Sequence, residues 1–238
     1  AGVDFFTQPL NEGPVTGRSI VLVTPDAQRS MFTYLGASKK LSVEDIDENI
    51  IKASKITYIE AYLWDEDCDK EAIVKAAEIA HSYNRDVAFS LSDKSCVDRH
   101  REEFLNFIKN HVDILFGNED EIKSLFAEED FYKTLDMIKP HIDIAAVTRG
   151  AKGSVVVNGR TKIYVESEKV ENVVDTTGAG DLYAAGFLYG LTQGRSLGTC
   201  AMIGSIAAAE IISHYGARPE ISLRGLVRNK LLSYGKRA

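Results

Sequence analysis

A chain of 238 residues, 45% of them apolar and 26% charged, can bury a sizeable core as one large domain or as one domain with a small appendage. Its net charge of −7 argues against a general surface for nucleic acid or for anionic membranes. No apolar run approaches the roughly 18 residues that span a bilayer, so we expect neither a nucleic-acid partner nor a membrane partner.

The three cysteines, Cys68, Cys96 and Cys200, are far apart in the sequence and odd in number. Their spacing matches no Cys-x-x-Cys pair and no mixed Cys/His metal motif. The first residues show no basic-then-apolar signal segment. We therefore expect a cytoplasmic protein with reduced thiols.

Two β-rich runs, 17–24 and 29–34, flank Pro25 and Asp26, a dipeptide that favours a tight turn. The pattern predicts a β-hairpin. A two-stranded hairpin is marginally stable by itself in water, so it must find further strands or a partner. On these residues alone, a plain surface hairpin is an equally open interpretation.

From Leu41 onward the sequence alternates between helical and strand patterns. We expect helices over 42–52, 70–83 and 98–110, and strands over 55–59, 86–90 and 112–116. Repeated strand–helix units predict an α/β fold with a doubly wound, mostly parallel sheet and helices on both faces. Ligands on such sheets bind at the carboxyl ends of the strands.

Asn118, Glu119, Asp120 and Glu121 directly follow one of those strand ends. An Asn cap followed by acids in the first helical turn explains them locally without any ligand. Further on, strands over 144–148 and 154–157 flank the loop 149–153. Its glycines allow close approach of the backbone to a flat or charged ligand, although an ordinary Gly-rich turn remains open.

The stretch Asp175-Thr-Thr-Gly-Ala-Gly-Asp181 joins the β-branched run 170–174, expected to be a buried strand, to the apolar run 182–191, expected to be a helix. A turn through Gly178 and Gly180 points free N–H groups and the positive end of a helix dipole at one place. That place suits a phosphoryl group gaining charge in a transition state. Asp181, in the first turn, can accept the proton of an attacking hydroxyl. The arrangement predicts a kinase.

Other interpretations compete for this stretch. A dinucleotide fingerprint needs a third glycine where Tyr183 stands, and no Walker-type Gly-x-x-x-x-Gly-Lys-Ser/Thr occurs in the chain. A tight turn with Asp181 as ordinary first-turn charge stays open. The helix expected over 197–214 carries small residues, Ser205 among them, that allow close approach of another helix or of an adenine base. A closing helix is expected over 222–233.

The motif 175–181 resembles the C-terminal signature of the ribokinase (PfkB) family of sugar and nucleoside kinases, and the likeness extends over the whole chain. The Glu12-Gly-Pro, 34–38 and 216–219 stretches are most similar to bacterial adenosine-kinase-like members. The resemblance implies a ribokinase-like α/β domain over 39–238 and a partial β lid over 1–38. It also implies ATP-dependent phosphoryl transfer to a primary hydroxyl of a nucleoside or sugar, with adenosine favoured over ribose or fructose.

The resemblance also assigns roles to residues. It makes Asp181 the catalytic base and Gly178, Ala179 and Gly180 the anion hole. It implies that Asn118 and Glu121 organise Mg²⁺ and the phosphates of ATP. It places the nucleotide against Thr148, Arg149, Gly150 and Gly153, with Ser205 near the base. Finally, it matches Asp175, the backbone at Thr177 and the loop 211–216 to a monovalent-cation site of the kind that takes K⁺. Glu220 stands where ribokinases often have Ser, so a K⁺ requirement is left open.

The first residues, Ala1 to Asp4, resemble a Gly-Val-Asp segment that normally lies well inside the family's fold. The family segment before it carries the first strands, a Gly-Gly substrate loop and an aspartate that grips the substrate hydroxyls. We therefore expect either a fragment or a chain completed by a partner. This leaves open a homodimer through the lid or an exposed sheet edge, and a non-catalytic relative that only binds nucleotide.

Overall fold

The computed structural model describes residues 3–27 and 29–235. Within this part of the chain the strands are β1 (Arg18–Val23), β2 (Arg29–Tyr34), β3 (Ile56–Glu60), β4 (Asp86–Ser90), β5 (Ile114–Asn118), β6 (Ile144–Thr148), β7 (Ser154–Asn158) and β8 (Thr161–Val165). The α-helices are α1 (Glu48–Ala53), α2 (Asp67–Ser82), α3 (Lys94–His111), α4 (Glu119–Phe126), α5 (Phe131–Ile138), α6 (Ala179–Thr192), α7 (Leu197–Ile211) and α8 (Leu223–Gly235).

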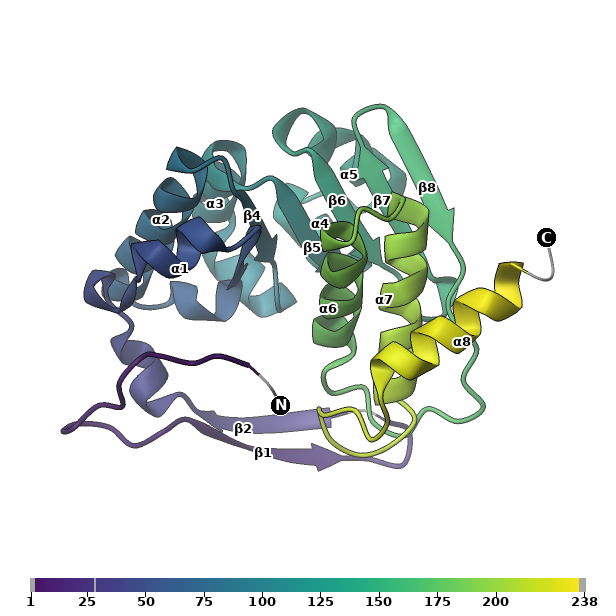
Figure 1. Cartoon of the computed structure of the whole chain (residues 1–238), viewed down its shortest axis with the longest axis horizontal. Coiled ribbons are helices and arrows are strands. Elements are labelled where there is room, and N and C mark those ends of the chain that lie inside the picture. Colours follow the sequence, from purple (N-terminus) through teal and green to yellow (C-terminus); the bar gives the residue numbers. More distant parts are fainter. Residues whose placement is uncertain (1–2, 28, 236–238) are drawn as a thin grey trace.

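The main sheet has six strands in the order β3-β4-β5-β6-β7-β8. Strands β3 to β6 run parallel, and β7 is antiparallel to both of its neighbours. Helices α1 to α5 cover one face and α6 and α7 the other, as Figure 1 shows. The expected α/β doubly wound fold with a mostly parallel sheet is confirmed.

Alternate residues of the central strands supply the two cores. Phe89 of β4 packs with Phe104 and Phe107 of α3, with ring centroids 5.4 and 5.3 Å apart. Ala88, its neighbour in the strand, belongs instead to the core beneath α6, together with Phe187. Because consecutive side chains of a strand point to opposite faces, these apolar runs require helices on both sides of the sheet.

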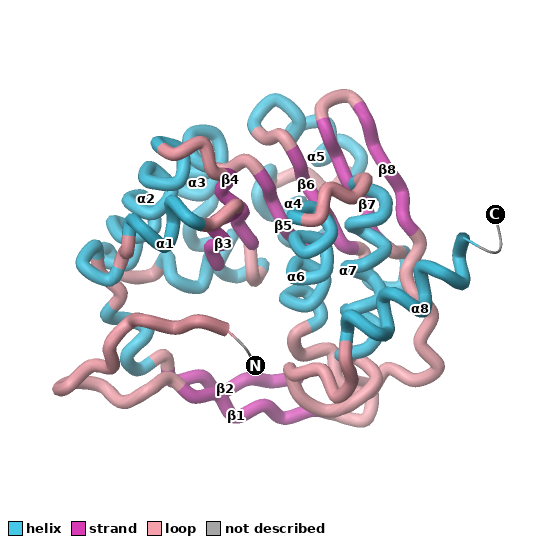
Figure 2. Tube along the Cα trace, viewed as in Figure 1, coloured by secondary structure: helices cyan, strands magenta, loops and turns pink. Residues whose placement is uncertain are grey.

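The hairpin β1–β2 forms a separate two-stranded sheet below the carboxyl ends of the main strands (Figure 2). Its register places Ser19 opposite Thr33 and Val21 opposite Met31. Residues directly opposite in an antiparallel pair share a face, so these side chains form one face of the hairpin and Ile20 and its partner form the other.

Three expectations about secondary structure are corrected. No single helix spans 42–52: residues Val43–Asp45 form a 3₁₀ turn, and α1 begins at Glu48 because the side chain of Asp47 caps it. Residues 170–174 form no strand: the run is an extended loop, and Val173 is 49% exposed. The expected helix 98–110 begins earlier, at Lys94, because the side chain of Asp93 caps it by accepting from the N–H groups of Ser95 and Cys96.

Candidate active site

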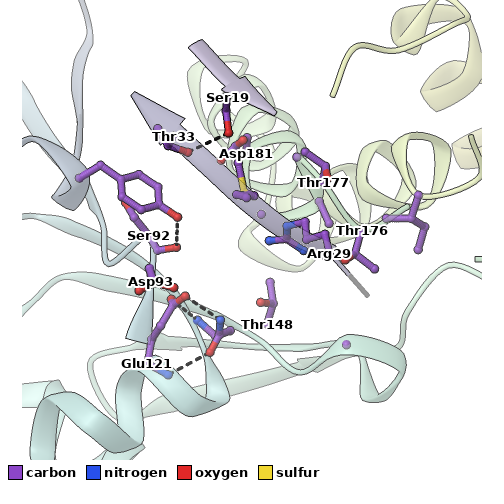
Figure 3. A pocket seen from close by; sticks show the side chains of 18 of the residues that line it. Ser19, Arg29, Thr33, Ser92, Asp93, Glu121, Thr148, Thr176, Thr177 and Asp181 are labelled. Atoms are coloured by element: carbon purple, nitrogen blue, oxygen red, sulfur yellow. Dashed lines mark hydrogen bonds between the residues drawn. The ribbon is translucent and has the colours of Figure 1, made fainter. Parts of the chain in front are cut away.

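A cavity of about 1300 Å³ lies between the hairpin β1–β2 and the carboxyl ends of the main strands. Most of the expected site residues line it: Asn118, Glu121, Thr148, Gly150, Thr177, Gly178, Ala179, Gly180 and Asp181. The hairpin contributes Ser19, Arg29, Met31 and Thr33 from the face described above (Figure 3). Segments from both ends of the chain and from its middle therefore meet around one space.

The N-terminus of α6 opens into this cavity. Gly178 is the N-cap residue, with a left-handed φ of +80°, and no side chain caps the helix. A Cβ on Gly178 would lie 3.3 Å from the Cβ of Ala217, whereas one on Gly180 would meet nothing within 4 Å. The N–H of Ala179 donates to the carbonyl oxygen of Thr176 at 3.3 Å, and no side chain of the described residues caps the helix. The N–H groups that follow Ala179 in the first turn, together with the positive end of the helix dipole, attract an anion.

Asp181 is exposed in the first turn of α6 and lines the same cavity. Glu60, at the end of β3, lies close enough that the two carboxylates interact. Burial raises the pKa of Glu60, and the negative charge of Asp181 raises it further. Sequence reasoning missed Glu60; its place at the carboxyl end of a predicted strand was the signal that pointed to it.

Asp175 is buried and supports the loop from behind. Its Oδ1 accepts hydrogen bonds from the backbone N–H and the hydroxyl of Thr177, at 2.9 and 2.6 Å. Its Oδ2 accepts from the N–H of Gly216 at 3.0 Å. Burial by itself would raise the pKa of Asp175, but these hydrogen bonds and the charge of Arg29 lower it below its usual value. The ionised carboxylate of Asp175 therefore holds the loop in place through hydrogen bonds and does not itself line the cavity.

Arg29 is a second residue that sequence reasoning missed. It extends from β2 and donates from Nη1 to the hydroxyl of Thr176 at 2.7 Å, directly beside the N-terminus of α6. Its side chain points into the cavity together with Asp181 (Figure 3). Period-two alternation from Met31 and Thr33 places Arg29 on the inner face of the hairpin, so the alternation was a usable signal.

Asn118 and Glu121 form a reciprocal capping box at the start of α4. The amide oxygen of Asn118 accepts from the N–H groups of Asp120 and Glu121, both at 2.9 Å. The carboxylate of Glu121 accepts from the N–H of Asn118 at 2.9 Å and from its Nδ2 at 2.6 Å. The helix cap that the sequence predicted at Asn118 is therefore present, and both side chains also line the cavity.

Glu121 is 6% exposed, and its surroundings disfavour the charged form of its carboxyl group. Burial is the main cause that raises its pKa to about 7, and the charges of Asp93 and Asp120 add to it, against the hydrogen bond from Asn118. Within the described residues no three His, Cys, Asp or Glu side chains cluster closely enough to hold a metal ion unaided. A cation that shares its coordination with a ligand's oxygens would relieve this concentration of negative charge.

The remaining expected residues lie outside the cavity lining. Arg149 pairs with Glu119 at 2.9 Å and its guanidinium stacks 4.3 Å from the ring centroid of Phe131. The hydroxyl of Ser205 accepts from the N–H of Glu168 at 2.7 Å. Gly153 has a φ of +81°, and a Cβ there would meet the carbonyl oxygen of Val165 at 2.0 Å. These contacts hold the loops that border the cavity, and the expected contacts of the three residues with a nucleotide stay predictions.

None of the helices within residues 3–27 and 29–235 is both long and apolar enough to cross a bilayer.

Comparison with known proteins gives a consistent result. Residues 1–223 match the pfkB family carbohydrate kinase. The crystal structure of adenosine kinase from Sinorhizobium meliloti is 47% identical, with a TM-score of 0.94, over 96% of this chain and 70% of that one. A probable sugar kinase from Rhizobium etli is 46% identical, with a TM-score of 0.95, over 97% of this chain and 70% of that one.

A curated relative, 5-dehydro-2-deoxygluconokinase from Listeria monocytogenes, is 27% identical over 216 residues, which are 87% of this chain and 66% of the relative. The chain thus spans about two thirds of the length of these proteins. The match to the family covers nearly the whole sequence, and the fold and the loop around α6 agree with it. The chain therefore belongs to the pfkB family of carbohydrate kinases.

Proposed function

We propose that this protein transfers a phosphoryl group from ATP to a primary hydroxyl of a nucleoside, with adenosine as the favoured acceptor. The observation that carries the proposal is the shared cavity of Asp181 and the uncapped N-terminus of α6. A carboxylate and a cluster of N–H donors beside each other supply the two requirements of phosphoryl transfer: a base for the hydroxyl and a positive site for the moving charge.

The residues divide the work by position. Asp181 accepts the proton of the acceptor hydroxyl, while the N–H groups at Gly178–Gly180 bind the equatorial oxygens of the transferring group. Arg29, held by Thr176 beside those N–H groups, adds a full positive charge at the same place. Closure of the hairpin over the reactants would exclude water from the transfer.

We assign ATP and Mg²⁺ to the wall of the cavity at the carboxyl ends of β5 and β6. Mg²⁺ prefers oxygen ligands and keeps several waters, so Glu121 and Asn118 would hold it through one or two contacts together with the phosphates. When bound, the ion neutralises charge on the β- and γ-phosphates. Thr148 and Gly150 line the same wall, and Gly150, with a φ of +56° and open space where a Cβ would be, lets the nucleotide approach the backbone.

The acceptor side of the cavity favours a flat apolar group. Met31 and Leu35 line it from the hairpin, and Tyr62 lines it from the turn after β3. The Tyr62 hydroxyl donates to the carbonyl oxygen of Ser92 at 3.1 Å, which holds the ring in place. An aromatic ring and aliphatic side chains in the lining of one cavity suit a nucleobase better than a free sugar.

A sugar acceptor is the second candidate, favoured by the likeness to the Rhizobium etli and Listeria monocytogenes proteins. A panel of adenosine, ribose, fructose and 5-dehydro-2-deoxygluconate, with coupled detection of ADP, separates the two. We expect the highest kcat/KM for adenosine, and a clear preference for a hexose or hexonate would refute the nucleoside assignment. Calorimetry with Mg-ATP is the companion measurement. Nucleotide binding without turnover on any acceptor would favour the non-catalytic alternative.

Several narrower expectations stay predictions. Asp175 already accepts three hydrogen bonds, and K⁺ binding at Asp175 and Thr177 stays a prediction. Measuring activity after replacing K⁺ with a large organic cation tests it. The division into a lid over 1–38 and a kinase domain over 39–238, the cytoplasmic location and a homodimer through the lid or sheet edge also stay predictions.

A further inference from the structure

Residues 212–221, in the connection between α7 and α8, lie beside the N-terminus of α6 (Figure 1). The carbonyl of Ile212 accepts from the N–H of Val174 at 2.8 Å, and the N–H of Gly216 donates to Asp175. Ala217 packs against Gly178 so closely that a Cβ on that glycine would lie 3.3 Å from its own. The position of the anion hole is therefore set from behind by this segment.

Glu210, in the last turn of α7, holds both ends of the segment. Its Oε1 accepts from the N–H groups of Glu220 and Ile221, at 2.9 and 3.3 Å, and lies 3.3 Å from Nε2 of His214. Glu210 is only 8% exposed, and its Oε2 is buried with no hydrogen-bond partner among the described residues. A buried carboxylate with an oxygen that accepts no hydrogen bond costs free energy of folding.

His214 completes the arrangement. Its side chain is 12% exposed; Nε2 faces Glu210, and Nδ1 lies 3.3 Å from the carbonyl of Tyr215 and 3.9 Å from a carboxylate oxygen of Glu220. Burial by itself lowers the pKa of His214. The carbonyl of Tyr215 and the carboxylates of Glu210 and Glu220 raise it by more, so the pKa lies above its usual value. The carboxylates of Glu210 and Glu220 on either side of the ring thus favour the protonated form of His214.

We propose that Glu210, with His214 as its countercharge, is a positioning residue of the anion hole. The carboxylate fixes residues 212–221, these residues fix Asp175 and Gly178, and those in turn aim the N–H groups of α6 at the transferring phosphoryl group. Glu210 touches none of the reacting atoms. The inference rests on the proposed phosphoryl transfer and adds to it a residue that acts from the far side of the loop.

The first test compares Glu210→Gln and Glu210→Ala with the wild-type chain. A misplaced anion hole weakens binding of the transition state more than binding of ATP. For Glu210→Ala we expect kcat to fall by on the order of 10- to 100-fold, with the KM for ATP nearly unchanged. Glu210→Gln keeps one oxygen acceptor for the two N–H groups and should recover part of kcat. His141→Gln, a variant at the other end of the sheet, is the control and should leave both constants unchanged.

The pH profile supplies a readout that a merely structural role would not change. Because the pKa of His214 is raised by folding, its contribution is complete below its ordinary value of about 6.5 and is lost as pH rises through the raised value. The kcat of the wild type should therefore fall in one step as pH rises through the raised pKa of His214. His214→Gln should have a low kcat without that step, and His214→Lys, which keeps a cation, should move the step to higher pH.

Amide hydrogen exchange over residues 176–181 separates this inference from the proposed function, since it needs no turnover. Glu210→Ala should exchange faster there than the wild type, in the same folded protein. Unchanged exchange, or a lowered melting temperature with unchanged kcat of the folded fraction, would overturn the positioning role. If the wild-type chain phosphorylates no acceptor, the proposed function fails, and the exchange measurement alone then decides whether Glu210 orders the loop.

Discussion

Glu121 offers a quantitative test because its burial works against stability. Its carboxylate is nearly inaccessible to water, and burial together with the charges of Asp93 and Asp120 raises its pKa to about 7 from an ordinary 4.5. At about 1.4 kcal/mol per pKa unit, this gap corresponds to about 3 kcal/mol. Replacing Glu121 by Gln removes the ionisation and keeps a side chain of the same shape.

The sign follows from proton linkage. The folded state binds the proton of Glu121 more tightly than the unfolded state does. Protonation of Glu121 therefore stabilises the folded wild type at low pH. That stability is lost as pH rises from about 4.5 through about 7. Glu121→Gln lacks this loss. The variant should therefore match the wild type at about pH 5 and exceed its free energy of unfolding by about 2–3 kcal/mol at about pH 8.

Urea unfolding in EDTA, over the range from about pH 5 to about pH 8, measures the difference. Glu119→Gln is the matched control in the same helical turn. Burial by itself raises the pKa of Glu119, but Arg149 and Lys123 lower it below its ordinary value of about 4.5. The stability that Glu119 contributes is lost only as pH falls below that value, so Glu119→Gln should be less stable than the wild type by a nearly constant amount from about pH 5 to about pH 8. A Glu121→Gln variant that is equal to or less stable than the wild type at about pH 8 would refute the reasoning. Mg-ATP should reduce the difference in unfolding free energy between Glu121→Gln and the wild type, because a cation stabilises the charged carboxylate of the wild type.

Three further substitutions test the rest of the site and the fold. Asp181→Asn should lower kcat roughly 10²–10⁴-fold while ATP affinity, measured by calorimetry, is kept; unchanged turnover with a lowered melting temperature would end the catalytic assignment. Arg29→Ala, which removes the charge held at 2.7 Å by Thr176, should lower kcat about 10²-fold or more, and an unaffected kcat would place the arginine outside the reaction. Gly186→Ala should cost about 1–3 kcal/mol of unfolding free energy, because its Cβ would lie 2.8 Å from the Cα of Gly204. The control Gly198→Ala, whose Cβ meets its nearest atom at 3.7 Å, should be neutral or stabilising in the same unfolding assay.

The sequence alone determined the features that depend on near neighbours in the chain. Alternating helical and strand periods predicted the α/β fold, because each period reflects which face of an element is buried. The glycines of 175–181 predicted the turn into α6 and the place of Asp181 in its first turn, both of which the structure has. The cap at Asn118 was also readable, since its hydrogen bonds join residues at most three positions apart.

Only the tertiary structure decided features whose partners are distant in the chain. The run 170–174 has the β-branched composition of a strand, but a strand exists only where another strand lies beside it, and none of the described segments pairs with it. Arg149, which was expected at the nucleotide, is paired with Glu119, 30 residues away in the sequence. Arg29 reaches Thr176 across 147 residues.

The same separation applies to the support behind the site. Nothing near Glu210 in the sequence shows that it binds the N–H groups of 220 and 221. The motif singles out Asp175, but it does not show that Asp175 accepts from the N–H of Gly216. Short-range propensity fixes the backbone within a turn or a strand. The register between elements is set by burial and hydrogen bonding summed over the whole core, and therefore only the folded chain shows which polar groups meet.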